Sequence, residues 1–140
     1  MARIHEDVAV TGLDAILGEV DAGASAGTIQ LRSGSAPANC EAADSGTLLA
    51  SMTLNDPAFA AAAVGTNKAD AALDVSPAIT DSSADASGTA AHFRIKDSNG
   101  RCVIQGTVGT SGADINFNSN VFSAGATVTI TGLTVSLAET

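Results

Sequence analysis

TAAHFRIKDSNGRCVIQGTV, residues 89–108, decides the fold because apolar and polar residues alternate on both sides of a turn. A period of two is typical of a strand with one buried face, since successive side chains point to opposite sides of a sheet. Residues 97–100 (DSNG) are turn formers, and Gly100 tolerates a left-handed backbone. The stretch therefore predicts a β-hairpin with Ala91, Phe93 and Ile95 facing inward and His92, Arg94 and Lys96 facing solvent.

Short alternating or apolar runs recur along the rest of the chain. About eight short strands with Gly-rich turns are typical of an all-β fold, an antiparallel β-sandwich or jelly roll. The last run changes phase after Ile130, which predicts a β-bulge at Thr131-Gly132. The run Phe59–Val64 is open between helix and other structure. Besides the hairpin, the predicted strands are Thr28–Arg32, Thr47–Leu54, Ala69–Val75, Ala78–Asp81, Ala113–Phe117 and Ala126–Leu137.

The N-terminal segment carries apolar residues at close to helical spacing between Ile4 and Val20. Glu6 and Asp7 favour a helix start there, because acidic groups interact well with the positive end of the helix dipole. A short helix or arm is predicted, with two open outcomes: packing within the domain, or reaching to a neighbouring subunit. Since 140 residues fit one domain, we expect a single domain over 1–140, with the helix or arm in 1–22 and the β-sandwich in 27–140.

Charge and cysteine content limit the partners. The net charge of −9 argues against nucleic acid, because phosphate binding depends on Lys and Arg. No segment has the apolar length of a membrane span, and the N-terminus lacks the apolar core of a signal peptide, so we expect no membrane partner and a cytoplasmic site of synthesis. Cys40 and Cys102 form no C-x-x-C motif. A disulfide between them is open, but two free thiols are expected in a reducing compartment.

Residues that could carry chemistry are sparse. His92 stands in no catalytic motif and is interpreted as a surface histidine rather than a base. Asp81 and Asp85 lack the spacing of a calcium loop and are interpreted as turn acceptors. The GTSG segment at 109–112 lacks the lysine of a phosphate loop. The sequence therefore predicts that the chain is not an enzyme and has no catalytic residue, no metal and no cofactor.

Two segments resemble small virion proteins of tailed bacteriophages. DSSADASGTAAHFRIKDSNGR (81–101), followed by VIQGTVGTSGADINFNS (103–119), is similar to their S-A-D-A-S-G-T-A-x-x-F-R-I segment, D-x-x-G turn and G-x-V-G-T-S-G-A-D segment. GTIQLRSGSAPA (27–38), after a short helix, resembles the same proteins, so the likeness covers most of the chain. The greatest likeness is to the jelly-roll cement (decoration) proteins of Bordetella-type short-tailed phages.

The resemblance implies a late structural protein that binds the outer surface of an assembled capsid and cements adjacent major capsid protein subunits. The implied partners are the major capsid protein and a second copy of the chain, in a homodimer rather than a trimer. The implied location is the virion surface, after assembly in the host cytoplasm. A clamp that engages several sites at once turns weak contacts into an effectively permanent attachment.

Three cations of the hairpin, Arg94, Lys96 and Arg101, are the candidate interface residues, and they make up half of the six Lys and Arg in the chain. One hypothesis is that they meet an acidic surface of the shell or of a sister subunit. The other is a solvated face that keeps an edge strand soluble. Two further functions stay open: a tail, collar or fibre-associated module, and a carbohydrate-binding β-sandwich, against which the absence of Trp and Tyr counts.

Overall fold

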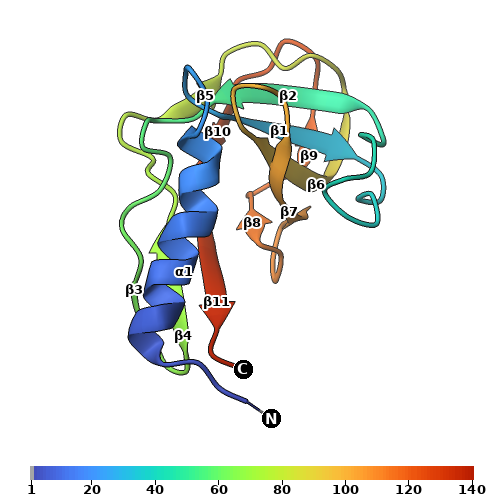
Figure 1. Cartoon of the computed structure of the whole chain (residues 1–140). Helices are drawn as coiled ribbons and strands as arrows, with labels where there is room; N and C mark the ends of the chain where they lie inside the picture. The colour runs from blue at the N-terminus through green and yellow to red at the C-terminus, as the bar shows by residue number, and fades with distance from the viewer. Residues whose placement is uncertain (1) are drawn as a thin grey trace.

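The computed structural model describes residues 2–140 and shows a mostly β protein with one short N-terminal helix (Figure 1). A curled sheet occupies the upper part of this view, with strand order β2-β1-β6-β7-β8. Its neighbours are antiparallel except β7 and β8, which are parallel, and β9 pairs with one end of β6. The strands of this main sheet are β1 (Thr28–Ser33), β2 (Leu48–Thr53), β6 (Gly88–Lys96), β7 (Cys102–Gly109), β8 (Ile115–Asn116) and β9 (Val121–Phe122).

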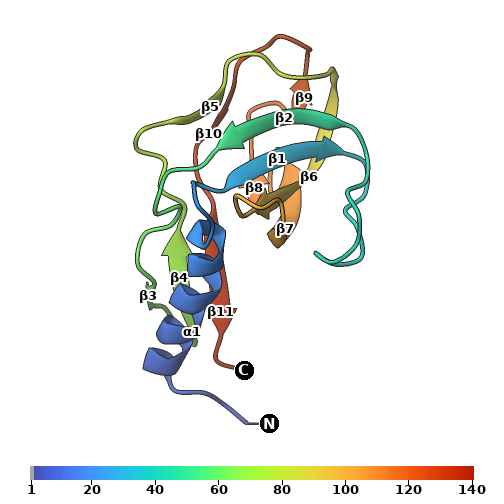
Figure 2. The same ribbon diagram turned by 45° about the horizontal axis from the view of Figure 1, so that its top comes forward.

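The helix lies beside a smaller sheet below the main one (Figures 1 and 2). It packs against β4 and β11, the paired strands of a sheet with order β11-β4-β3. β5 and β10 form a separate antiparallel pair. The bounds are α1 (Glu6–Gly18), the 3-10 helix η1 (Glu19–Asp21), β3 (Ala63–Val64), β4 (Lys68–Ala72), β5 (Ile79–Asp81), β10 (Val128–Ile130) and β11 (Thr134–Ala138).

β6 and β7 form the predicted hairpin, with one irregularity in their pairing between Ile95 and Lys96. Gly100 has a φ of 86° in the connecting turn, a left-handed conformation in which a Cβ atom is strained. The side chains of Phe93 and Ile95 are buried, as the alternation predicted. The hairpin also supplies β6, the middle strand of the main sheet, and its neighbour β7, and the other strands of that sheet pair with these two or with β1.

The N-terminal segment packs within the chain, which confirms the first of its two predicted outcomes. His5 caps the helix, because its ring Nδ1 accepts a hydrogen bond from the backbone N–H of Asp7. One side of α1 is buried against the smaller sheet, and together with Val20 of η1 it joins a core shared with the main sheet. Burial of this apolar side provides most of the stability of such a short helix. The buried residues are Ala9, Leu13, Leu17 and Val20.

The ambiguous run Phe59–Val64 is extended rather than helical, and β3 is its last part. Its backbone N–H groups have partners outside the run: Ala60 donates to the carbonyl of Ala72 at 2.9 Å. Ala62 donates to the carboxylate of Asp14, on α1, at 2.7 Å. These tertiary hydrogen bonds outweigh the weak helix preference of a short alanine run.

The predicted last strand, Ala126–Leu137, is wrong as a single bulged strand. The phase change at Thr131-Gly132 marks a change of sheet instead, since β10 pairs with β5 whereas β11 pairs with β4. Side-chain phase alone does not distinguish the two arrangements, because both reverse the face that is buried. Residues 2–140 contain eleven strands rather than about eight, because the last run is divided in two and because the two-residue strands β3 and β9 were not predicted.

Gly18 and Gly100 form a matched pair for a stability test. A Cβ atom would meet nothing within 4 Å at either position, but Gly18 has a helical φ of −60° whereas Gly100 has a φ of 86°. We expect Gly18→Ala to raise the free energy of unfolding by about 0.5–1 kcal/mol. Gly100→Ala should lower the free energy by about 1 kcal/mol or more. Urea titrations followed by circular dichroism measure both, and equal effects would contradict this assignment.

Candidate functional site

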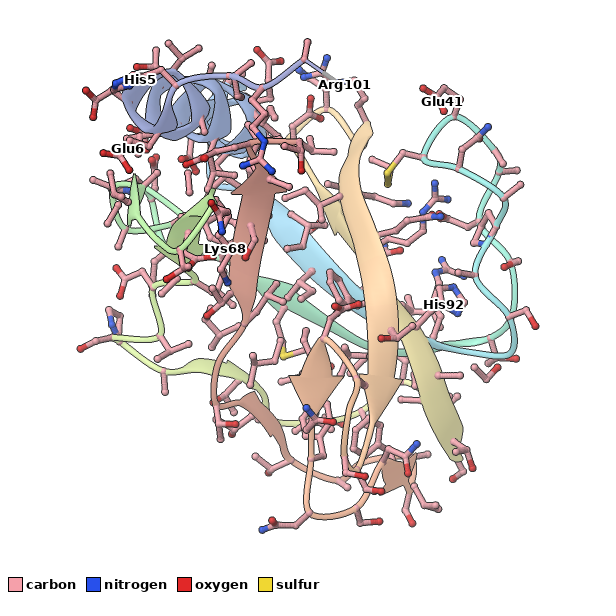
Figure 3. The ribbon with its side chains drawn as sticks, turned by 90° about the horizontal axis from the view of Figure 1, so that it is seen from below. His5, Glu6, Glu41, Lys68, His92 and Arg101 are labelled. Atoms are coloured by element: carbon pink, nitrogen blue, oxygen red, sulfur yellow. A yellow bond between two sulfur atoms is a disulfide. The ribbon has the colours of Figure 1, made fainter. Side chains whose placement is uncertain are left out.

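The segment between β1 and β2, residues 34–47, crosses the outer face of the main sheet, and we call it the covering loop. Figure 3 shows the loop, with Glu41 labelled, running alongside the hairpin, and the His92 side chain lying between strand and loop. Nothing in the sequence predicted that this segment lies over the hairpin. Its position changes the interpretation of every residue on the hairpin's outer face.

His92 and Arg94 are buried, so their predicted place on a solvent face is wrong. Each is 1% exposed, because the covering loop lies over them. The Nδ1 atom of His92 is 2.8 Å from the carbonyl oxygen of Gly34. Arg94 donates to the carbonyl oxygens of Cys40 at 2.8 Å and Ala42 at 3.0 Å. Both side chains therefore hold the loop on the sheet.

Asp44 of the covering loop is the acceptor for three cations from two strands. Its carboxylate lies 2.6 Å from Arg94 Nη1, 2.6 Å from Lys96 Nζ and 3.1 Å from Arg32 Nη2. Burial raises the pKa of Asp44, but the hydrogen bonds from Lys96 and Arg94 and the charge of Arg32 outweigh burial and lower the pKa below its ordinary value. Asp44 therefore stays charged at neutral pH. We call Asp44 and its three cationic partners the Asp44 cluster.

Arg101 differs from the other two predicted interface residues because its side chain is 58% exposed. It forms ion pairs with Glu19, at the end of α1, and with Asp97, at the start of the hairpin turn. Asp97 also accepts hydrogen bonds from the backbone N–H groups of Asn99 and Arg101, at 3.0 and 2.9 Å. Arg101 thus braces the turn against the helix while keeping much of its surface in contact with solvent.

Cys40 and Cys102 form a disulfide, so the expectation of two free thiols is wrong. Their Cα atoms are 5.2 Å apart although the residues are 62 positions apart in sequence. The bond joins the covering loop to the first residue of β7. No spacing pattern could have revealed it, because the two residues meet only through the path of the loop.

The structure therefore brings Arg94 and Lys96 together on Asp44 and leaves Arg101 beside them. All three line one hollow of about 340 Å³, whose wall includes the disulfide. The outer face of the hairpin is no free basic patch, since Asp44, Glu19 and Asp97 are paired with its cations. Sequence reasoning missed Asp44 as their acceptor, because nothing in CEAAD (40–44) distinguishes it from other loop acids.

We expect acid to weaken the fold through Asp44 and Asp97. Burial raises the pKa of Asp97, but the hydrogen bonds from Arg101 and Asn99 outweigh burial and lower it below the ordinary 3.8. A carboxyl group with a lowered pKa stabilises the folded state above its unfolded pKa, and this contribution is lost as the pH falls through the folded pKa. The melting temperature should therefore fall steeply below about pH 4, where calorimetry can follow it.

Asp97→Asn tests the origin of this acid dependence. The variant should melt below the parent protein at neutral pH. The difference in melting temperature should narrow as the pH falls through the lowered pKa of Asp97, because the carboxylate of the parent is then protonated. The pKa of Asp21 is shifted in the opposite direction, because burial raises it despite the hydrogen bond from Ala58. Asp21→Asn is therefore the control, and its melting temperature relative to the parent should improve as the pH rises. A gap for Asp97→Asn that is constant with pH would contradict the assignment.

The structure also shows the role of Asp81 and bears on metal sites and membrane-spanning helices. Asp81 accepts hydrogen bonds from the backbone N–H groups of Ser51 and Ser83, so it acts as a turn acceptor, as interpreted. Within residues 2–140, no group of three or more His, Cys, Asp or Glu side chains is arranged to hold a metal ion. In the same range, no helix has the length and apolar character needed to cross a membrane.

A second hollow lies between β8, β9 and β10. It has a volume of about 450 Å³ and a lining rich in amide and hydroxyl side chains. Phe117 and Phe122 also line it, and their rings pack edge to face with centroids 5.3 Å apart. The combination of hydrogen-bonding groups with aromatic rings is the kind that small polar ligands contact.

Comparisons with known proteins return no match: no family model, no curated protein and no solved structure is similar to the chain. The function is therefore inferred from the residues and from the geometry of the covering loop.

Proposed function

We propose that the chain is a structural virion protein of a tailed bacteriophage that binds the outer surface of the assembled capsid and cements adjacent major capsid protein subunits. The observation that carries the proposal is the likeness of residues 81–119 to the turn and strand motifs of small phage virion proteins. In the fold, this segment comprises the hairpin β6–β7, the turns on either side of it and the short strand β8. It is the central part of the main sheet, and its outer face carries the covering loop.

The bracing of this segment supports a clamping role. The covering loop is held by a disulfide, by the Asp44 cluster and by Arg94 contacts to the loop backbone. A protein that joins two subunits gains affinity when its own contact surface is already ordered, because little conformational entropy is lost on binding. A second contact on the same rigid body then raises the overall affinity, because the first contact holds the second at a high effective concentration.

The jelly-roll class of the fold is part of the same proposal. The main sheet supplies one layer, and we propose that the pairs β5–β10 and β4–β11 form an incomplete second layer. A homodimer, a place on the virion surface and assembly in the host cytoplasm also belong to the proposal. So does a purely structural role, without catalysis, cofactor, membrane or nucleic-acid partner.

The contact with the shell is proposed to include Arg101 and the exposed part of Lys96. Arg94 is not part of this contact surface, because its side chain is 2% exposed and holds the covering loop. Capsid occupancy should fall for Arg101→Glu, which places an acid where an acidic partner is proposed. Lys68→Glu is a matched control on the smaller sheet, where Lys68 is 43% exposed and paired with Asp70. Equal occupancy for both variants would remove Arg101 from the interface.

A heating experiment tests the cementing function itself. Phage heads assembled without the chain should release DNA at a lower temperature than complete heads, because subunit joints lack the area that the clamp buries across them. A standard interface buries about 1,600 Å² in total. Adding purified protein to the deficient heads should restore the higher temperature. Release at the same temperature with and without the chain would contradict the proposal.

A carbohydrate-binding module is the second candidate, and the hollow beside Phe117 and Phe122 is the observation in its favour. Glycan-array binding that is lost in Phe117→Ala would support it. A tail, collar or fibre-associated module shares the virion origin of the first candidate and differs from it in the number of copies per particle.

A further inference from the structure

Solvent reaches the Cys40–Cys102 disulfide from two sides. One side is the hollow of about 340 Å³ that Lys96 and Arg101 line. The other is a hollow of about 320 Å³ with Ile16 and Val103 in its wall. Both cysteines line both hollows, and both are only partly buried. A small thiol or disulfide reagent can therefore approach the bond without unfolding of the chain.

The covering loop is held around Cys40 by contacts that do not involve sulfur. Arg94 donates to the carbonyl oxygen of Cys40 itself at 2.8 Å and to that of Ala42 at 3.0 Å. Asp44 anchors the following part of the loop through Lys96 and Arg94, both at 2.6 Å. These contacts keep the backbone of Cys40 in place independently of the covalent bond.

The preceding part of the loop has its own attachment. Gln105 of β7 donates from Nε2 to the carbonyl oxygen of Pro37 at 2.8 Å. Cys40 therefore lies between two anchored points, Pro37 and Asp44, and opposite Cys102 on the strand that carries Gln105. Two thiols in this arrangement would stay close together, because loop closure is already achieved by the polar contacts.

We propose that Cys40 and Cys102 are a reversible redox modification site, at which the covering loop gains or loses its covalent link to β7 without loss of the fold. A thiolate of one cysteine attacks a low-molecular-weight disulfide, forming a mixed disulfide and expelling one thiolate. The second cysteine, as thiolate, attacks the mixed disulfide and expels the other. The reagent gains the two electrons that the protein loses, and the two cysteine protons pass to the expelled thiolates.

The point at which this disulfide would form depends on the proposed function. A virion protein is made in a reducing cytoplasm and used outside the cell, where disulfides persist. Reduced chains would therefore assemble on the shell with the loop held by polar contacts alone. Oxidation after release would then fasten the loop covalently on the finished particle.

The test uses the isolated oxidised chain in native buffer. Dithiothreitol should reduce the bond fully without denaturant, at a rate proportional to its concentration, with both thiols then detected by alkylation and mass spectrometry. The far-ultraviolet circular dichroism spectrum should stay the same while the melting temperature falls by on the order of 10 °C. Oxidised glutathione should restore the bond and the melting temperature.

Gln105→Ala and Arg94→Met test the polar attachment, with Arg3→Met as a control at an exposed position. Reoxidation by glutathione should slow roughly tenfold in either loop variant and stay unchanged in the control, because the effective concentration of the two thiols falls. If Arg94→Met does not fold, Gln105→Ala still decides the point, since it removes only the Pro37 contact among the loop anchors.

Two results would overturn the proposal. One is reduction that requires denaturant or proceeds at a rate independent of dithiothreitol concentration, as expected for a bond reached only by unfolding. The other is loss of the folded spectrum on reduction. Either would leave the cementing function intact, because that function is tested on phage heads rather than on the isolated chain.

Discussion

Arg94→Met is expected to lower the free energy of unfolding by about 3 kcal/mol, at the lower end of the range for breaking a buried ion pair. The variant loses the 2.6 Å contact with Asp44 and leaves the loop carbonyls of Cys40 and Ala42 without their donor. Unpaired buried carbonyls retain the full cost of lost hydration. The loss should be seen even with the disulfide intact, since the bond joins only one point of the loop to the sheet.

Urea unfolding followed by circular dichroism is the suitable measurement, because the chain has no Trp or Tyr for fluorescence. Arg3→Met is the matched control: it makes the same replacement at an exposed position and should change the free energy by less than about 0.5 kcal/mol. A similarly small change for Arg94→Met would mean that the covering loop contributes little to the fold.

Removal of the disulfide, by Cys40→Ala together with Cys102→Ala, should lower the free energy of unfolding by about 4 kcal/mol. The bond closes a segment with a sequence separation of 62, and in the chain-entropy model such a crosslink acts by restricting the unfolded state. The double variant should still fold, because domains of this size are typically stable by about 5–15 kcal/mol.

The reduced parent protein is the natural control for this variant. Its melting temperature should match that of the double variant, since both lack the crosslink and keep the Asp44 cluster. If the double variant had the same melting temperature as the oxidised parent, a stabilising disulfide would be contradicted. A double variant that is unfolded would show that the polar contacts alone cannot hold the loop.

The hairpin and the helix were predictable because their signals are local. The period of two around Phe93 and Ile95, the turn formers at 97–100 and the acidic start of α1 each depend on residues close in sequence. Thr28–Arg32 and Thr47–Leu54 match β1 and β2 to within one residue at each end for the same reason. Local alternation indicates that a strand exists and which side chains share a face.

Local alternation does not show what covers that face. His92 and Arg94 were assigned to solvent because polar residues alternating with apolar ones usually face water. The covering loop lies over them and supplies Asp44 and backbone carbonyls as partners, through contacts with Arg94 that are 50 and 52 positions apart in sequence. A buried arginine with so many acceptors is a tertiary property, and the nearby sequence carries no sign of it. The same holds for the disulfide.

The last strand illustrates a second limit. The change of phase after Ile130 was visible in the sequence, and it is real in the structure. Whether the chain bulges within one sheet or passes to another depends on the partner strands, β5 and β4, and not on the run itself. The candidate interface was limited in the same way, since Arg101 is exposed and Arg94 is not although both lie on the predicted outer face.

The number of copies of the chain per phage particle tests the cementing role most directly. Gel densitometry of purified particles, calibrated against the major capsid protein, gives this number. A cement protein that occupies repeated positions on a symmetric shell should be present in hundreds of copies. A few dozen copies or fewer would place the chain in the tail or collar instead, and its absence from the particle would contradict the virion role altogether.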